Sequence, residues 1–273
     1  MNNSLLPLLL FPFSAISNAG FEPIADENLS NITGQSGVTI ESDFHATIGS
    51  LEYKDQGIVA INEIEIGGAN KATYFGKDWG ASSHSGNKLD GSLVTIDILP
   101  DGDLVIAGSV DPKMGGGIID FGITTGAVDL ISADRLTSAR LIDSISLSGI
   151  ITKFRTKVDA QTSHFITEAE FGIDDLDIDF SGLNMKVENV LIAAPSYFES
   201  LEDWGAQGLA LQDITVKASF DIFANDDGLM IESESLLFDM QVGSISIGNQ
   251  QVGSVMLDDV NISQSSTLIK GHL

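Results

Sequence analysis

The chain has no cysteine and few residues of positive charge. Its 273 residues include 13 lysines and arginines against 39 aspartates and glutamates, which gives a formal net charge of −26. Without cysteine there is no disulfide framework, no thiolate metal site and no cysteine nucleophile. The negative charge repels phosphate backbones and leaves no basic surface for them, which excludes nucleic acid as a partner.

Long apolar runs are also missing beyond the first twenty residues. No later stretch approaches the roughly 18 consecutive apolar residues of a membrane-spanning helix, so the sequence predicts no transmembrane helix. Hydrophobic residues nevertheless make up 43% of the chain and are interleaved with the acidic ones. This composition predicts a folded chain, because a disordered acidic chain is poor in apolar residues.

The first 19 residues have the pattern of a signal peptide. Residues 5–16 are apolar but are interrupted by Pro7 and Pro12, and the run is too short to span a bilayer. Small residues at Ser17 and Ala19 predict cleavage before Gly20. We therefore expect an exported protein that is periplasmic, associated with the outer membrane or extracellular.

The remainder of the chain alternates between apolar and polar residues. Leu176, Ile178 and Phe180 alternate with Asp177 and Asp179. The same period of two recurs in residues 93–99, 145–151 and 214–222. Because successive side chains of a strand point to opposite faces, this pattern predicts strands with one apolar and one acidic face. The sequence predicts an all-β fold that is mainly antiparallel.

The chain also repeats itself. Asp78-Trp-Gly-Ala81 recurs as Asp203-Trp-Gly-Ala206, and these segments hold the only two tryptophans. Further matches join residues 94–106 to 218–231, and 141–148 to 256–263. Because the order is kept, we predict two internally duplicated halves, residues 37–149 and 150–273, after an N-terminal segment of residues 20–36. The halves would form an elongated β-meander or a β-solenoid-like sheet.

Helix is predicted at few positions. Residues 26–33 form the clearest candidate, with Asp26 placed to cap the helix and Gly34 placed to end it. Short helices are also expected within residues 132–141 and 196–204. Turns are predicted at residues 100–102 and 226–228, where aspartate and glycine interrupt the alternation.

Three aspartates suggest a metal site. Asp175, Asp177 and Asp179 would lie on one face of a strand, and carboxylate oxygens are the ligands that Ca²⁺ prefers. The alternative is a solvated acidic face whose charge keeps strand edges apart. No EF-hand loop occurs, and the sequence predicts no other cofactor.

The two tryptophans are candidate interaction residues. Trp79 and Trp204 lie in the repeated Asp-Trp-Gly segments, where they could be exposed for binding a partner, or could instead close the core of each half. No catalytic residues are predicted, because no G-x-S-x-G segment or H-E-x-x-H motif is present. A secreted hydrolase remains an open alternative.

Residues 29–40, Leu-Ser-Asn-Ile-Thr-Gly-Gln-Ser-Gly-Val-Thr-Ile, follow an acidic stretch at 22–27. This segment resembles the mature N-termini of secreted Gram-negative proteins that carry a Leu-Ser-x-x-Thr-Gly-Gln-x-Gly-Val/Ile motif. Some of these proteins are described as Fil-type pilus-system proteins, and others belong to uncharacterised envelope families. The resemblance covers about twenty residues and implies a cell-envelope or surface role, with no catalytic residues to carry over.

These observations predict an exported, non-enzymatic cell-envelope or surface protein with a structural, adhesive or pilus-associated role. Its partner would be another protein, or a second copy of itself, at the cell envelope. The alternative is a protein of the periplasm or outer membrane that binds or transfers an apolar ligand such as a lipid, because long amphipathic strands can surround an apolar groove.

Overall fold

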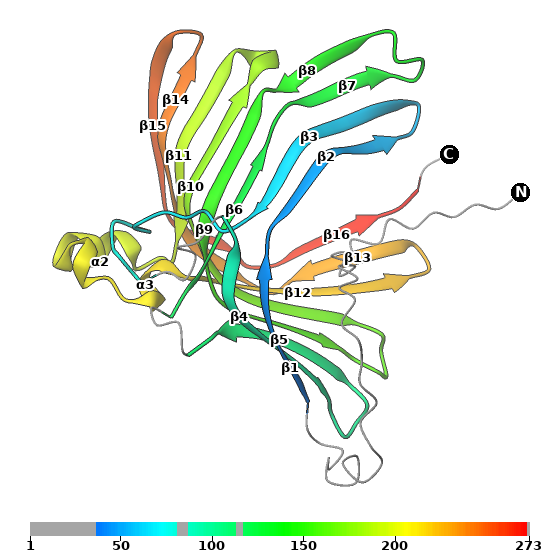
Figure 1. Cartoon of the computed structure of the whole chain (residues 1–273), viewed down its shortest axis with the longest axis vertical. Helices are drawn as coiled ribbons and strands as arrows, with labels where there is room; N and C mark the ends of the chain where they lie inside the picture. The colour runs from blue at the N-terminus through cyan, green and yellow to red at the C-terminus, as the bar shows by residue number, and fades with distance from the viewer. Residues whose placement is uncertain (1–36, 81–86, 113–116, 272–273) are drawn as a thin grey trace, which may run out of the picture. The chain divides into compact units, whose positions relative to one another are not determined.

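The computed structural model describes residues 37–80, 87–112 and 117–271 (Figure 1). All of them belong to one compact unit, Gly37–Leu273. The predicted signal peptide of residues 1–19 and the segment of residues 20–36, with the helix expected at 26–33, lie outside the described residues. Among the described residues, no helix is both long enough and apolar enough to cross a membrane.

The prediction of an all-β, mainly antiparallel fold is confirmed, since sixteen strands form one open sheet in which all the named pairs are antiparallel. The opening strand begins at Val38, directly after Gly37. The first nine strands are β1 (Val38–Phe44), β2 (Ala46–Lys54), β3 (Gly57–Gly67), β4 (Leu89–Ile98), β5 (Leu104–Val110), β6 (Ile119–Thr125), β7 (Val128–Ser132), β8 (Ser138–Ile142) and β9 (Ser144–Val158).

The last seven strands follow the turn after β9 and are interrupted by short helices. The strands are β10 (Phe165–Phe180), β11 (Met185–Ala193), β12 (Val216–Asn225), β13 (Gly228–Ser233), β14 (Leu236–Ile247), β15 (Gln250–Ile262) and β16 (Ser265–Ile269). The helices are η1 (Ser181–Leu183), α2 (Tyr197–Trp204), η2 (Ala206–Gly208) and α3 (Leu211–Ile214).

The sheet divides into two branches that share the central hairpin of β9 and β10 (Figure 1). The first branch has the order β2-β3-β6-β9-β10-β11-β14-β15, and the β7–β8 hairpin pairs with the part of β3 that β6 does not reach. The second branch has the order β1-β4-β5-β9-β10-β12-β13-β16. The division is possible because β9 and β10, at 15 and 16 residues, are long enough for each to pair with two successive neighbours on one side.

The strand pairing repeats itself along the chain. In the first half, β1 and β2 pair with β4 and β3, and in the second half the single strand β10 pairs with β12 and β11. β5 and β6 both pair with β9 in the first half. In the second half, β13 pairs with β16 and β14 pairs with β15. The halves therefore have the same strand pairing, except that the β7–β8 hairpin of the first half has no counterpart in the second. They meet along β9 and β10, so the boundary expected between residues 149 and 150 falls inside β9.

Two connections carry the tryptophans, one between β3 and β4 with Trp79 and one between β11 and β12 with Trp204. The buried core lies where the branches separate and where these two Trp-bearing connections meet. Its buried side chains come from both connections and from the sheet, and they are Tyr74, Phe75, Ile118, Ile150, Ala193, Tyr197, Leu209 and Ile214. The phenol ring of Tyr197, at the start of α2, packs edge-on against Phe75 with centroids 5.6 Å apart. Residues 68–80 and α2 thereby cover the sheet at this point (Figure 1).

The local predictions had mixed outcomes. The turns at 100–102 and 226–228 join β4 to β5 and β12 to β13, and α2 occupies most of the predicted helix at 196–204. The helix expected within residues 132–141 is wrong, because this segment turns and begins β8. Pairing with β7 determines the strand, and the Arg140 guanidinium also contacts the Asp129 carboxylate at 3.1 Å. Tertiary pairing has overridden a weak helix propensity.

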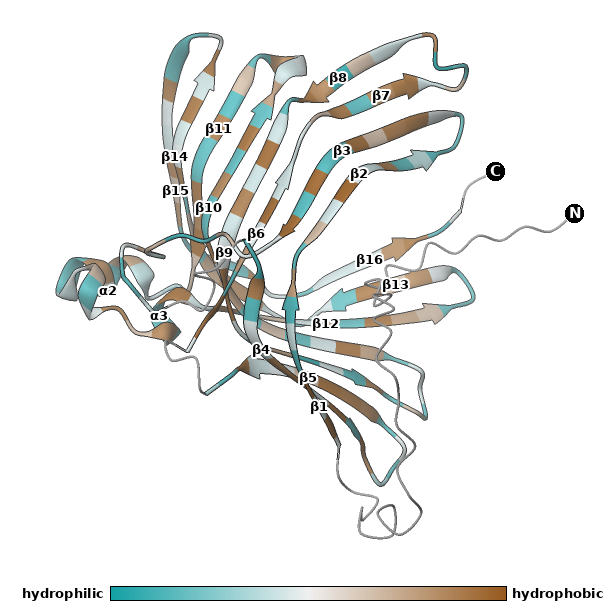
Figure 2. Cartoon of the chain, in the orientation of Figure 1, coloured by the Kyte–Doolittle hydropathy of each residue, from teal (hydrophilic) through white to brown (hydrophobic). Residues whose placement is uncertain are grey.

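The two faces of the sheet differ in polarity, which Figure 2 shows as alternation along the strands. Directly paired residues lie on the same face, so the register defines each face. Leu147 pairs with Leu176, Phe154 with Ala169, and Val158 with Phe165. We call the face that carries these side chains the apolar face. The opposite face carries the carboxylates of β10 and is covered by the two connections near the core.

Candidate functional site

The connection between β3 and β4 is held on the sheet by two aspartates. The Tyr74 hydroxyl donates a hydrogen bond of 2.6 Å to Oδ2 of Asp120, which also accepts one of 3.1 Å from the Asn70 backbone N–H. The Phe75 backbone N–H donates to Oδ1 of Asp174 at 2.5 Å. Asp120 lies on β6 and Asp174 on β10, so the connection is attached to two separate strands.

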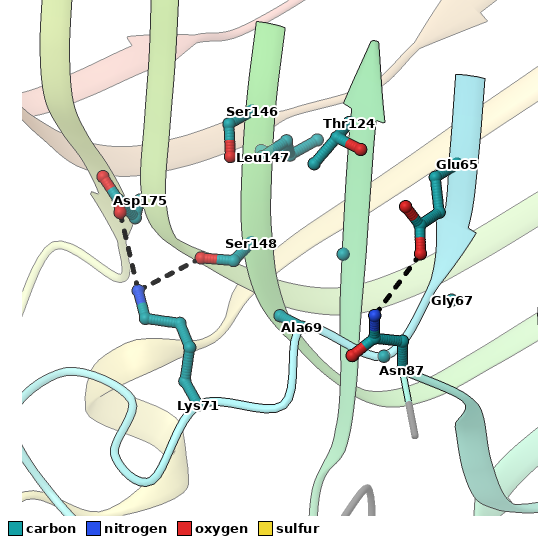
Figure 3. A pocket seen from close by; sticks show the side chains of 12 residues that line it. Glu65, Gly67, Ala69, Lys71, Asn87, Thr124, Ser146, Leu147, Ser148 and Asp175 are labelled. Carbon is teal, nitrogen blue, oxygen red and sulfur yellow. Dashed lines mark hydrogen bonds and ion pairs between the residues drawn. The ribbon is translucent and has the colours of Figure 1, made fainter. Parts of the chain in front are cut away.

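Lys71 completes this polar cluster (Figure 3). Its ammonium group lies 2.5 Å from Oδ2 of Asp174 and 3.6 Å from Oδ2 of Asp175, and it donates to the Ser148 hydroxyl at 3.2 Å. Both aspartates come from the stretch of β10 where the register shifts. The shift brings two successive carboxylates to one lysine, an arrangement that uniform alternation would not produce.

A polar cavity of about 240 Å³ opens beside Lys71. Its polar lining includes Glu65, Lys71, Asn87, Thr124, Ser148 and Asp175 (Figure 3). Glu65 contacts His45, whose Nε2 is 2.9 Å away, and accepts one hydrogen bond from Asn87, and these contacts hold the pKa of the Glu65 carboxyl below its usual value. Glu65, Asn87, Lys71 and Ser148 are therefore engaged in hydrogen bonds or ion pairs, whereas Oδ1 of Asp175 has no hydrogen-bond partner among the described residues.

The chemistry of the cluster favours attachment of the connection over catalysis. Burial and the hydrogen bond to Asp120 both raise the pKa of Tyr74, so its hydroxyl remains a hydrogen-bond donor. Burial also raises the pKa of Asp175, with the neighbouring Asp177 as the next cause. A serine nucleophile at Ser148 would need a base with a free lone pair, whereas the nearby Lys71 ammonium is bound by two carboxylates.

The three aspartates of the predicted calcium site lie on β10 with different partners. Asp175 contacts Lys71, Oδ1 of Asp177 accepts from the Asn189 backbone N–H at 2.7 Å, and Asp179 contacts Lys186 at 2.7 Å. Among the described residues, no group of three or more such side chains gathers in a way that could hold a metal ion. The calcium site stays a prediction from the sequence.

The two tryptophans occupy different environments. Trp79 is partly buried against the core, its indole N–H donates to the Tyr74 carbonyl at 2.9 Å, and the Lys77 ammonium lies 4.3 Å from its ring centroid. Trp204 ends α2 and is 73% exposed. Trp79 therefore fits the core interpretation, while Trp204 is accessible to a partner. A binding role for either residue stays a prediction.

The apolar face itself is partly accessible. Both connections pack on the opposite face, and several large apolar side chains of the apolar face are more than a third exposed, whereas Val190 and Val242 are buried. The exposed side chains include Ile98, Phe165, Ile247, Val255, Leu257 and Ile269. Exposed apolar areas of this kind mark interaction or ligand-binding surfaces. The alternation predicted the face, but the sequence could not show that no helix of the described chain would cover it.

Comparison with protein families gives a single partial match. The model of a family of unknown function (DUF6160) matches residues 1–100, which extend through β1 to β4 and make up less than half of the chain. The chain is similar to that family over this segment. Neither the curated proteins nor the solved structures contain a match to the chain.

Proposed function

We propose that this chain is an exported, non-enzymatic protein of the cell envelope or cell surface, with a structural, adhesive or pilus-associated role. The observation that supports it is the apolar face that the described residues leave partly exposed, since a protein acting alone in water would be expected to bury such a face. The polar cluster around Lys71 supports the same proposal, because its groups fix the fold and are bound to one another.

Fractionation of cells that produce the protein tests this proposal. We expect the protein in the envelope or surface fraction, with a mass that corresponds to cleavage before Gly20. A chain that keeps its leader and stays in the cytoplasmic fraction would contradict it.

The second candidate is an apolar-ligand carrier of the periplasm or outer membrane, and the same face favours it. Apolar side chains continue across the branch from Ile178 through Val187 to Ile245, which are paired in register on β10, β11 and β14. A lipid chain could lie along such a surface, since apolar ligand sites are lined mainly by hydrophobic side chains.

Native mass spectrometry after purification without detergent tests the carrier. Leu257 lies on the apolar face opposite Met240, whereas Met256 lies on the other face opposite Gln241, and both are exposed. For a carrier, co-purified lipid should be lost in Leu257→Glu and retained in Met256→Glu. A wild-type protein without bound lipid would argue against this function.

A further inference from the structure

The open sheet ends in two pairs of edge strands, and the short strand β8, which pairs only with β7, is a further edge. β1 and β2 form one end, and β15 and β16 form the other. Within the described residues each of these four strands pairs on one side only. Their outer backbone N–H and C=O groups can therefore pair with another strand.

These edges have little of the usual protection by proline and lysine. β1, β15 and β16 contain no proline, lysine or arginine, and β2 has only Lys54 at its end. The other charged residues of the four strands are acidic. The edges also expose apolar side chains, among them Val38, Leu51 and Tyr53 at one end and Val252, Met256 and Ile269 at the other.

The chain already contains a junction between two such ends. β9, the last strand of the first half, pairs with β10, the first strand of the second half, from Val158 opposite Phe165 to Ser144 opposite Asp179. By their connections, β15 and β16 are the counterparts of β9, and β1 and β2 are the counterparts of β10. The β15–β16 edge therefore corresponds to the β9 side of this junction, and the β1–β2 edge corresponds to the β10 side.

We infer that a second copy of this chain pairs its β1–β2 edge with the β15–β16 edge of the first, in the register of β9 and β10. This inference rests on the proposed function and names the partner. The contact is head-to-tail, so it builds a chain of copies, or a ring if the rotation between copies closes.

The internal pairing fixes the register at one end of the contact. Ile106 and Ile231 are counterparts, because they end the matched segments 94–106 and 218–231. Ile106 pairs with Thr156 and Ile231 pairs with Thr267, so Thr267 is the counterpart of Thr156. On the other side of these residues, Ile106 pairs with Ile96, which pairs with Val38, and Ile231 pairs with Ile222, which pairs with Phe165. Val38 is therefore the counterpart of Phe165.

Because Thr156 pairs with Thr167, and Phe154 with Ala169, the contact places Thr267 opposite Ile40 and Ser265 opposite Ser42. Glu41 then lies opposite Ser266, so this part of the contact opposes no two carboxylates directly. The apolar face continues from one copy to the next.

The absence of cysteine allows a direct test. Two purified variants, Ser42→Cys and Ser265→Cys, are mixed and oxidised, and we expect a disulfide-linked dimer containing one copy of each. Ser266→Cys is the matched control, because its side chain points to the opposite face and should not form a disulfide with Ser42→Cys. The mass of the wild-type protein in light scattering should rise with concentration, and more so at high salt, which screens the repulsion between acidic copies.

Three outcomes would overturn the inference. They are a wild-type mass that stays monomeric at every concentration, linkage through Ser266→Cys in place of Ser265→Cys, and a Ser42→Cys/Ser265→Cys double variant that links only within one chain. None of these results bears on export or on the envelope fraction, so failure of this inference is distinguishable from failure of the proposed function.

Discussion

The two halves share their strand connections but complete them with different side chains. Each half has a wholly buried aspartate on one of two corresponding strands, Asp120 on β6 and Asp239 on β14. Asp120 accepts hydrogen bonds from a tyrosine and a backbone N–H, whereas Asp239 accepts one bond, of 2.9 Å, from the Asp259 backbone N–H. The duplicated topology therefore tolerates quite different local polar networks.

The Trp-bearing connections differ in the same way. In the first half the described part of the connection, residues 68–80, is an extended loop bound by Lys71, Tyr74 and Trp79, and in the second half the connection contains the helices α2 and α3. The first connection depends on specific hydrogen bonds, while the second depends on helix packing. Substitutions at equivalent positions should therefore have unequal effects.

The largest difference is expected between the tryptophans. Trp79→Ala should lower the free energy of unfolding by about 2–3 kcal/mol, because it removes a partly buried ring that packs on the core and donates to the Tyr74 carbonyl. Trp204→Ala should change it by less than about 0.5 kcal/mol, since this ring is mostly exposed. Urea unfolding of both variants measures the difference, and equal losses would show that Trp204 also packs in the core.

The tyrosines should differ by a smaller amount. Tyr74→Phe removes the donor to Asp120 and leaves a buried carboxylate with less compensation, at a cost of about 1–3 kcal/mol. Tyr197→Phe is the control, because its ring lies in the same core and its hydroxyl makes no side-chain hydrogen bond within the described residues. Urea unfolding should show little change for Tyr197→Phe. A loss as large as that of Tyr74→Phe would assign the effect to core packing.

The sequence predicted the strands because alternation records which side of a sheet each residue occupies. It could not predict the two branches, because branching depends on where β9 and β10 change neighbours, and a continuous alternation does not mark that point.

The candidate sites show the same limit. Asp174 and Lys71 are far apart in the sequence, and their contact depends on a register shift within β10 that has no sequence signature. The Asp-Trp-Gly repeat identified both connections, but it could not separate a packed Trp79 from an exposed Trp204. Trp204 is the last residue of α2, whereas Trp79 lies in a loop within the described part of the first connection.

The smallest effect is expected at Asp239, and it has the opposite sign. Burial raises the pKa of the Asp239 carboxyl, and its Oδ2 has no partner among the described residues. Asp239→Asn retains an acceptor for the Asp259 N–H and removes the buried charge, so it should raise the free energy of unfolding by about 1 kcal/mol at neutral pH.

The pH dependence provides the control for Asp239. A carboxyl whose pKa is higher in the folded than in the unfolded state contributes stability below the unfolded pKa, and this contribution is lost as the pH rises through the folded pKa. The advantage of Asp239→Asn over the wild type should therefore vanish in acid and grow as the pH rises to neutral. Asp120→Asn weakens a charge-assisted bond from Tyr74 and should give no such gain. If urea unfolding shows the same gain for both variants, the two buried aspartates are equivalent after all, and the difference between the halves is limited to the tryptophans.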